Sequence, residues 1–360
     1  MAAAHSLDDV VWWQVFEGVL TRVGGRFARA EPRCTVRELL LGLLAPIERK
    51  NGWWLAEQAG HDSPDRMQRL LRTAVWDTDA VAADLRAFVV EHLGHRDGIL
   101  VADETGYLKK GTHSVGVQRQ YSGTAGRVEN FQIGVFLAYV SPQGRALIDR
   151  RLYLPRCWSD DERRYTTAGV PDEVLFATKP ELAMAMIDAA VTAKGHRFYA
   201  WAWVTVLDEG EGCHSLLVRR GTDGQLAYYL CWSPTPVPLL RLVTVAGSRW
   251  SVEEAFQTAK GQVGLDQYQC RGWTAWHRFT LLAMIALAVL TIVAIAQRAA
   301  TSTDDLIDLT LAETRRLINT AIHRTLPTEL AMAWSRWRRR HQAIAKRSHY
   351  KRRHESTTSA

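Results

Sequence analysis

Residues 248–261, SRWSVEEAFQTAKG, place two cations and a carboxylate at the spacing of helical turns. At about 100° per residue, Arg249, Glu253 and Lys260 fall within about 60° of arc on an α-helix. An adjacent face is apolar and comprises Val252, Ala255, Ala259 and Val263. The charged strip fits ordinary surface ion pairs, worth roughly a few tenths of a kcal/mol each. It equally fits a carboxylate flanked by cations that bind an anion.

A second carboxylate ends a short apolar segment. Residues 98–106, GILVADETG, predict a short apolar β-strand with Asp103 at its end. A carboxylate there would be held rigidly and would still reach solvent, as a ligand of a divalent cation must. Lys109 and Lys110 follow closely, so an anion near Asp103 would meet two cations. A capping or turn aspartate is the alternative interpretation.

The charge of the chain is concentrated in its C-terminal tail. The 360 residues carry a formal net charge of +7, and 47% of them are hydrophobic, enough for a sizeable core. Residues 336–353 hold nine Lys or Arg and no acid, so the remainder, at +7 less 9, carries −2. Such a tail is either solvated and disordered or bound to nucleic-acid phosphates. Trp334, Trp337 and Tyr350 in and beside the tract favour nucleic acid.

Cysteine usage and hydropathy bear on the cellular compartment. The five cysteines form no CxxC pair, and the sequence shows no signal peptide, so we expect a reducing cytoplasm and no structural zinc. Residues 279–296 are uncharged and approach the length of a membrane span. This segment contains five alanines and two threonines and stands alone in the chain. We therefore expect a buried central helix and no membrane association.

The hydrophobic periodicity predicts an α+β chain with three parts. Residues 1–95 are predicted to be helical, and residues 52–75 are compatible with a DNA-binding helix-turn-helix. Residues 96–300 are predicted to hold strands, a helix, a β region at about 197–236 and the long apolar helix. Residues 301–360 are predicted to hold one helix and the basic tail.

Seven stretches together resemble a bacterial insertion-sequence transposase of the DDE type, and are most similar to the insertion-sequence-701 family. They are VADETGYLKKG, GVQRQYSGTAGRVENFQIGVF, LFATKPELA, KGHRFYAWAW, GSRWSVEEAFQTAKGQVGLDQYQ, RGWTAWHRFTLLAM and AWSRWRRRHQA, which lie between residues 101 and 343. The resemblance implies a ribonuclease-H-like core preceded by an all-α N-terminal domain. It also implies that three carboxylates hold two Mg²⁺ or Mn²⁺ ions for DNA cleavage and strand transfer.

The resemblance gives roles to individual residues. Asp103 matches the family's first catalytic aspartate and Glu253 its glutamate, both as metal ligands. Arg249 and Lys260 complete the family's arginine-x3-glutamate-x6-lysine signature and would hold the DNA backbone beside the metals. The tyrosine that often stands three residues before that arginine is Ala246 here. Together with the charge pattern, the resemblance assigns DNA contacts to Lys109, Lys110, Arg249, Lys260, Arg338, Arg339 and Arg340.

The family's second aspartate has no counterpart. It normally ends a strand between the segments that match ELAMAMIDAAVTA and KGHRFYAW, but here Ala193 is followed directly by Lys194. We therefore expect an internal deletion and an incomplete sheet. Asp208 lies too late in the chain to replace the missing acid, and Asp188 lies in the middle of a predicted helix. Two carboxylates bind two Mg²⁺ poorly, because each ion needs several charge-compensating oxygens.

Three functions are compatible with these features. The first is a DDE transposase with impaired chemistry, acting on double-stranded DNA at terminal inverted repeats and target sites. The second is a catalytically inactive remnant that binds transposon ends and represses an intact copy. The third, a single-span membrane protein, depends on residues 279–296 alone. By analogy with the family, we expect a homodimer on DNA in the bacterial cytoplasm, associated with the nucleoid.

Overall fold

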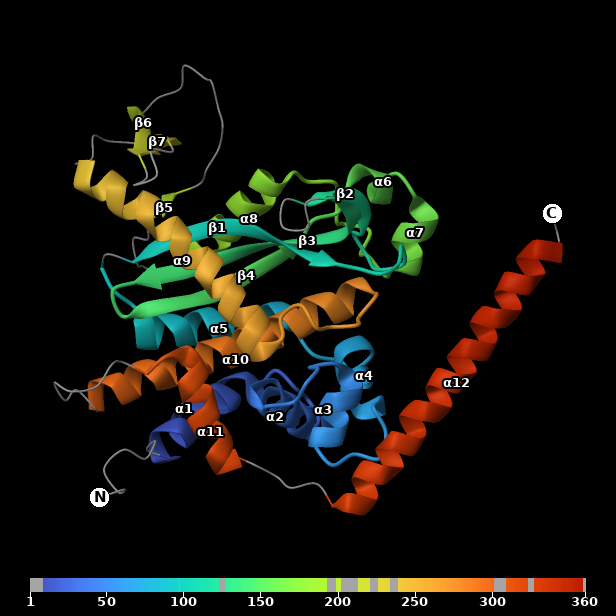
Figure 1. The fold of residues 1–360 in the computed structure, drawn as a ribbon. Coiled ribbons are helices and arrows are strands. Elements are labelled where there is room, and N and C mark those ends of the chain that lie inside the picture. The colour runs from blue at the N-terminus through green and yellow to red at the C-terminus, as the bar shows by residue number, and fades with distance from the viewer. Residues whose placement is uncertain are drawn as a thin grey trace.

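The computed structural model describes residues 9–96, 98–122, 127–192, 199–201, 213–220, 226–233, 239–300, 309–322 and 327–358 (Figure 1). Helices and a mainly antiparallel sheet make up these residues, as the α+β prediction requires. The described N-terminal residues are helical: α1 (Asp9–Gly24), α2 (Ala30–Leu44), α3 (Gly52–Gln58), α4 (Asp65–Arg72) and α5 (Thr78–Leu93).

Local sequence explains where the short helix α3 begins and how the chain turns after it. The Asn51 side chain accepts hydrogen bonds from the backbone N–H groups of Trp53 and Trp54 at 3.1 and 3.2 Å, which satisfies donors that the helix leaves without partners. Gly60 has a φ of +81°, a conformation that glycine adopts without a Cβ penalty. The chain therefore turns sharply between α3 and α4.

The central sheet is built around one long strand. Its strands are β1 (Ile99–Leu108), β2 (Gln118–Ser122), β3 (Arg127–Ser141), β4 (Gly144–Leu152) and β5 (Tyr199–Trp201). Strand β3 pairs antiparallel with β1 on one side and with both β2 and β4 on the other. Strand β5 pairs parallel with the start of β1. The three strands predicted from the sequence at β1, β3 and β4 are confirmed, whereas the short polar strand β2 was missed.

Helices cover both faces of this sheet. The short helices α6 (Arg156–Ser159) and α7 (Glu162–Thr167) follow β4, and α8 (Lys179–Thr192) packs on one face of the sheet. Helices α9 (Leu239–Val263) and α10 (Trp273–Ala300) pack on the other face (Figure 1). The predicted apolar face of α9 is confirmed, because all four of its side chains are buried: Val252, Ala255, Ala259 and Val263.

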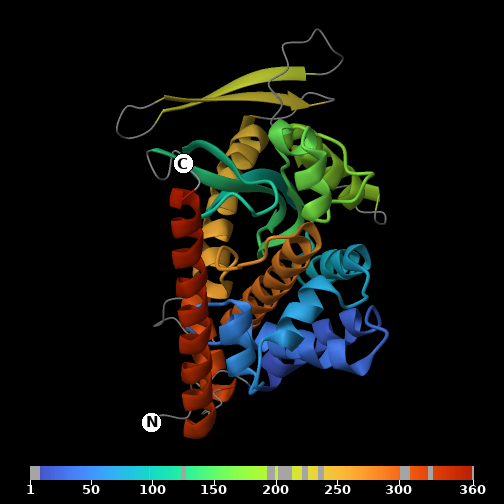
Figure 2. The ribbon, with the colours of Figure 1, turned by 90° about the vertical axis from the view of Figure 1, so that its right-hand side faces the viewer.

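Helix α10 is the centre of the hydrophobic core. It lies between the sheet and the N-terminal helices (Figure 2) and packs against β4, α1, α2, α4, α5, α9 and a later helix, α11 (Leu311–Ile322). The described residues contain one helix that is long and apolar enough to cross a membrane, residues 273–298. Within its apolar 18-residue stretch, 89% of the residues are buried inside the protein. The expectation of a buried central helix therefore agrees with the structure.

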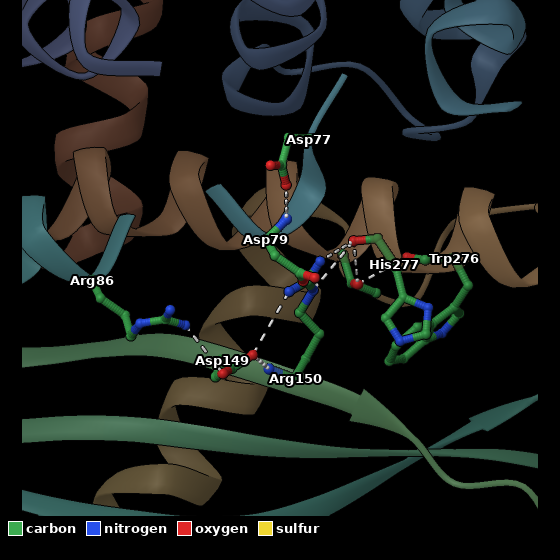
Figure 3. A network of polar contacts seen from close by, with 8 residues as sticks. Asp77, Asp79, Arg86, Asp149, Arg150, Trp276 and His277 are labelled. Carbon is green, nitrogen blue, oxygen red and sulfur yellow. Dashed lines mark hydrogen bonds and ion pairs between the residues drawn. The ribbon is translucent and has the colours of Figure 1, made fainter. Parts of the chain in front are cut away.

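A buried ionic network joins β4 to α5 and α10 (Figure 3). Arg150 is 1% exposed, and its guanidinium donates to the backbone carbonyl of His277 at 2.9 and 3.2 Å. Asp149 beside it accepts a hydrogen bond from Arg86 of α5 at 3.2 Å. Burial lowers the pKa of Arg150 to about 10, which still leaves it charged at neutral pH. The network fixes the position of α10 on the sheet.

The remaining elements lie at the periphery. Strands β6 (Cys213–Arg220) and β7 (Leu226–Ser233) form an antiparallel hairpin within the predicted β region. Helices α11 (Leu311–Ile322) and α12 (Thr328–Thr358) follow α10, and the C-terminal half of α12 extends from the side of the N-terminal helices up to the level of the sheet (Figure 1). Buried residues of the N-terminal helices belong to the same core cluster as those of α10 and the sheet. The domain boundaries at residues 95 and 300 stay predictions.

Candidate active site

Asp103 follows buried apolar residues but lies in the middle of β1, not at its end as the sequence predicted, because pairing with β3 continues to Leu108. Its side chain is half-buried, and Oδ1 accepts a hydrogen bond from the backbone N–H of Glu104 at 2.8 Å. Since side chains alternate along a strand, Asp103 shares a face of the sheet with Tyr107 and Lys109. Glu104 points to the other face, where Lys179 of α8 forms an ion pair with it at 2.6 Å.

Helix α9 brings Glu253 to the face that carries Asp103. Asp103 pairs with Phe136 across the β1–β3 ladder, so both side chains lie on one face. The Phe136 ring packs against Phe256 of α9, with ring centroids 5.6 Å apart. Glu253 is half-buried and lies about one helical turn before Phe256. Asp103 and Glu253 therefore flank the same aromatic contact, although they are far apart in the sequence.

Two further contacts define how α9 crosses the sheet. Glu254 forms an ion pair with Arg145, at the beginning of β4. Nearer the end of the helix, the Lys260 ammonium donates to the backbone carbonyl of Gly106 in β1 at 3.3 Å. The helix thus passes from β4 towards β1. The two neighbouring acids therefore have different surroundings. Glu254 forms an ion pair with β4, whereas Glu253 lies on the face of α9 that also carries Lys260.

Two lysines and two tyrosines form a cluster further along the face that carries Asp103. The Lys109 ammonium lies 3.5 Å from the centroid of the Tyr268 ring and 5.8 Å from that of Tyr107. The Lys260 ammonium lies 5.5 Å from the Tyr107 ring centroid, on which both cations converge. Burial lowers the pKa of Lys109 to about 8 and also lowers the pKa of Lys260. An anion bound here would favour the charged form of both lysines.

Buried hydrogen bonds hold the tyrosine platform in place. The Tyr268 hydroxyl donates to the side-chain carbonyl of Gln132 and accepts from the indole N–H of Trp276 at 3.0 Å. The Gln132 amide in turn donates to the Val115 carbonyl at 2.6 Å. Sequence reasoning missed Tyr107 and Tyr268. Because side chains alternate along a strand, the position of Tyr107 four residues after Asp103 could have identified it as a neighbour on the same face. The sequence around Tyr268 gives no such signal.

The other predicted DNA-binding residues lie in different surroundings. Lys110 is exposed, next to the lysine cluster. Arg249 lies in α9, one turn before Glu253. Arg338 forms an ion pair with Glu57 of α3 and lies 4.9 Å above the Trp54 ring, so it serves to dock α12.

Arg339 and Arg340 are exposed on α12. They lie in the same helix as Arg338, one and two residues further along. The basic tail is helical over its described length, in contrast to a disordered tail. Its exposed cations therefore have a defined helical spacing.

The aromatic residues of the tail have a structural role that the sequence interpretation did not foresee. Trp334 is 1% exposed, and its indole N–H donates to the His61 carbonyl at 2.8 Å. Trp337 packs edge-on against Trp53 of α3 at 4.5 Å and stacks on His341 at 4.0 Å. These two tryptophans anchor the beginning of α12 to α3 and its neighbours. Because both indole rings pack against other parts of the protein, the structure does not support stacking of nucleic-acid bases on both of them.

The predicted helix-turn-helix corresponds to α3 and α4. Three arginines are exposed on α4, at about one-turn intervals: Arg66, Arg69 and Arg72. This arrangement is compatible with contacts to phosphates. The assignment of DNA reading to residues 52–75 stays a prediction.

The carboxylates of the site are too few for a two-metal centre. The described parts of the chain contain no group of three Asp, Glu, His or Cys side chains placed to hold a metal ion. Asp103 and Glu253 supply two carboxylates, and Asp188 is exposed on α8, which covers the opposite face. Asp208 and the junction at Ala193 lie outside the described residues. The described site therefore does not fit the two-ion arrangement that the resemblance implies.

Comparison with known proteins identifies the family. Residues 22–212, more than half of the chain, match the DDE superfamily endonuclease family. The chain therefore belongs to the DDE superfamily endonucleases. Asp103 lies within the matched region, and Glu253 lies beyond it. The predicted resemblance to DDE insertion-sequence transposases is confirmed at this level.

Two similar proteins extend the comparison. A protein of Microchaete diplosiphon described as a "probable transposase for insertion sequence element IS701" is 31% identical over 97 residues. That match spans 27% of this chain and only 26% of the relative's length. A solved structure of the piggyBac transposase synaptic complex with hairpin DNA aligns with 91% of this chain and 85% of that chain, at 10% identity and a TM-score of 0.41.

Proposed function

We propose that the chain is a DNA-binding protein of the insertion-sequence transposase type whose own cleavage and strand-transfer chemistry is impaired. Its partner is double-stranded DNA, at the terminal repeats of a mobile element and at target sites. Membership of the DDE superfamily endonucleases supports the transposase origin. The observation that carries the proposal is the placement of Asp103 and Glu253 on one face of the sheet, which also carries Lys260 and, further along β1, Lys109.

A ribonuclease-H-like core is the architecture that we propose for the sheet and its helices. In support, β1, β3 and β4 form an antiparallel meander, and β5 pairs parallel with β1 after the helix α8. The first acid lies on the central strand β1 and the other on a late helix, α9, which packs on the same sheet. The deletion at Ala193 belongs to this proposal, because the second acid of the family would belong to the missing strand.

In this proposal the chain's residues divide into ligands and DNA contacts. Asp103 and Glu253 are the remaining carboxylates of a site that in the family holds Mg²⁺ or Mn²⁺. Lys109 and Lys260 neutralise a DNA phosphate further along the same face of the sheet, with Lys110, Arg249, Arg339 and Arg340 as further contacts along the DNA backbone. Two molecules on paired ends, at the nucleoid, would follow the pattern of the family.

An inactive, repressor-like remnant is the second candidate function. The observation in its favour is the lack of a third metal-binding side chain near Asp103 and Glu253 among the described residues. Such a protein would retain the cationic face, and would occupy transposon ends without cutting them. Both candidates predict binding, and they differ in whether any residual cleavage occurs.

A combined binding and cleavage assay tests both candidates. Purified full-length protein is mixed with labelled duplexes from the sequences that flank its gene, first in EDTA and then with Mg²⁺ or Mn²⁺. We expect specific binding in EDTA and little or no nicking with either metal ion. Weak nicking in Mn²⁺ that is lost in Glu253→Gln would favour impaired chemistry, and no nicking would favour the remnant.

Two outcomes would contradict the proposal in different ways. Efficient cleavage or strand transfer in Mg²⁺ would show that a third ligand exists and that the chemistry is intact. Failure to bind the flanking duplexes, at low and at physiological salt, would remove the DNA-binding function itself. Lys260→Ala serves as the binding control, since it removes a cation without removing a carboxylate.

A further inference from the structure

A polar cavity lies where β1 ends, beyond the lysine cluster. It has a volume of about 480 Å³, within the range of small-molecule sites. Its polar lining consists mainly of Thr112, His113, Gln118, Arg119, Asn130 and Arg164. None of the described residues that line it is acidic. The cavity therefore attracts anions.

The sheet register connects this cavity to the candidate active site. The backbone N–H of Lys109 donates to the Asn130 carbonyl at 2.9 Å, and Asn130 pairs with Arg119 across the β2–β3 ladder. Asn130 and Phe136 are six residues apart in β3, so they lie on the face that carries Asp103. Six residues of strand span about 20 Å. Asn130 and Arg119 thus continue the face that carries Asp103 and Lys109, and the cavity lies at this end of the sheet.

The wall formed by Arg164 is held in a fixed position. Its guanidinium carbon lies 3.9 Å from the centroid of the Trp158 ring, and Nη2 donates to the Thr112 carbonyl at 3.2 Å. Trp158 is 2% exposed, and its indole N–H donates to the Val117 carbonyl at 2.7 Å. A buried aromatic ring therefore supports one side of the guanidinium plane, while Arg164 also lines the cavity. Little ordering is needed when a ligand binds.

We infer that this cavity holds one nucleotide of bound DNA, both its phosphate and an unpaired base. The inference rests on the proposed function and adds a subsite about 20 Å from Asp103, or roughly six base-pair steps along a duplex. The guanidinium groups of Arg119 and Arg164 bind the phosphate, since they match its oxygens in bidentate geometry. A base stacks on the Arg164 plane, and the amide of Asn130, on the same face as Arg119, bonds its edge.

Single-strand binding by the full-length protein tests this assignment. Fluorescence anisotropy in EDTA compares a single-stranded oligonucleotide of about 20 nucleotides with the duplex of the same sequence. We expect Arg119→Gln and Arg164→Gln each to weaken single-strand binding about tenfold, the loss of one strong phosphate contact. Arg164→Lys keeps the charge but loses the planar group, so an intermediate loss is expected.

Arg163 provides the matched control. It is exposed on α7, next to Arg164, but does not line the cavity, and Arg163→Gln makes the same change in charge. We expect less than a twofold loss for this variant. If Arg163→Gln and Arg119→Gln lose the same single-strand affinity, the loss reflects only the net charge of the protein, and the subsite is overturned. Unfolding curves identify any variant that fails to fold, and Arg119, being exposed, supplies the decisive variant.

The subsite and the proposed function fail in distinguishable ways. If wild-type protein does not bind the flanking duplex, the proposed function fails. If it binds that duplex, but Arg119→Gln and Arg164→Gln bind the single strand as tightly as Arg163→Gln does, only the subsite fails. If the two variants lose single-strand affinity while duplex affinity falls less than twofold, the subsite is supported.

Discussion

Lys109 shows how a single residue can make DNA binding depend on pH. Its ammonium is buried against the Tyr268 ring, and burial lowers its pKa to about 8, against 10.5 for an exposed lysine. The lysine is therefore charged at pH 7 and largely neutral at pH 9. A bound phosphate raises the pKa again, because it favours the charged form. Asp266 already offsets a part of the cost of burying this charge, and a bound anion would offset more of it.

We predict that DNA affinity falls by roughly five- to tenfold between pH 7 and pH 9, as one charge-assisted contact is lost. Lys109→Arg should reduce this pH dependence, because a guanidinium stays charged throughout the range. Anisotropy titrations at constant ionic strength measure the effect. Lys110→Arg is the control, because Lys110 is exposed. An equal pH dependence in wild type and Lys109→Arg would show that Lys109 does not contact DNA.

Lys50 is a buried lysine with a purely structural position. It is 2% exposed, and its ammonium donates to the Ala45 carbonyl at 2.6 Å, just beyond the end of α2. Its backbone N–H donates to the Gln267 side chain at 2.7 Å, so it also contacts the turn between α9 and α10. Burial lowers its pKa to about 7. Between pH 7 and 10.5 the unfolded chain binds more protons than the folded chain at this residue, so stability rises with pH.

We predict that the free energy of unfolding increases from pH 7 to pH 9 by about 2 kcal/mol more in wild type than in Lys50→Met. The methionine keeps the apolar stem but has no charge to bury. Urea denaturation at the two pH values gives the difference. Lys110→Met, at an exposed position, should retain the wild-type pH dependence. The interpretation is wrong if Lys50→Met gains as much stability as wild type.

Among the elements, α12 has two parts with different surroundings. Its beginning is docked through Trp334, Trp337 and Arg338, whereas residues 339–347 are exposed. Arg338 pairs with Glu57, which is 6% exposed. Removing the arginine would leave a buried carboxylate without its cation. The next residue, Arg339, has the same charge but lies in solvent.

We predict that Arg338→Gln lowers the free energy of unfolding by about 2 kcal/mol, since Glu57 loses its partner. Arg339→Gln should change stability by less than about 0.5 kcal/mol and weaken DNA binding instead. Denaturation and salt-dependent DNA titrations on the same two variants separate the effects. Similar stabilities for the two variants would mean that the ion pair does not dock α12.

The elements also show which features the sequence could predict. The apolar face of α9 and the buried helix α10 follow from local periodicity, and β1, β3 and β4 follow from apolar runs between turn residues. Strand β2 was missed because its residues, QRQYS, show no apolar alternation. The pairing of Asp103 with Phe136 depends on strand register, which the separate segments do not encode.

The partners of individual site residues were equally hard to predict. Arg338 contacts Glu57 across most of the length of the chain. Lys109 contacts Tyr268, which is separated from it by more than half of residues 96–300. Such contacts depend on how helices dock, which the local sequence does not show. The basic composition of the tail therefore predicted a DNA contact for Arg338, whereas in the structure this residue docks α12. The assignments of Asp103 and Glu253 came from family motifs, and their shared face became visible only with the register of β1 and β3.

At the scale of the whole molecule, α10 joins two regions that the sequence separates at residue 95. Its buried side chains contact the N-terminal helices on one side and β4 on the other. The Arg150 network adds polar contacts between β4, α5 and α10. A core shared in this way should unfold as one unit. If one region unfolded alone, the apolar side chains of α10 that it covers would be exposed to water, which costs free energy.

We therefore predict that Leu287→Ala, at a position 2% exposed in α10, lowers stability by about 2–4 kcal/mol and weakens both regions together. Hydrogen exchange measured by mass spectrometry should show faster exchange in α1–α5 and in β1–β4 by similar factors. Ile344→Ala, at an exposed position of α12, is the control and should leave both unchanged. Faster exchange confined to one region would show that residues 1–95 form an independent domain, because only separate cores could lose stability separately.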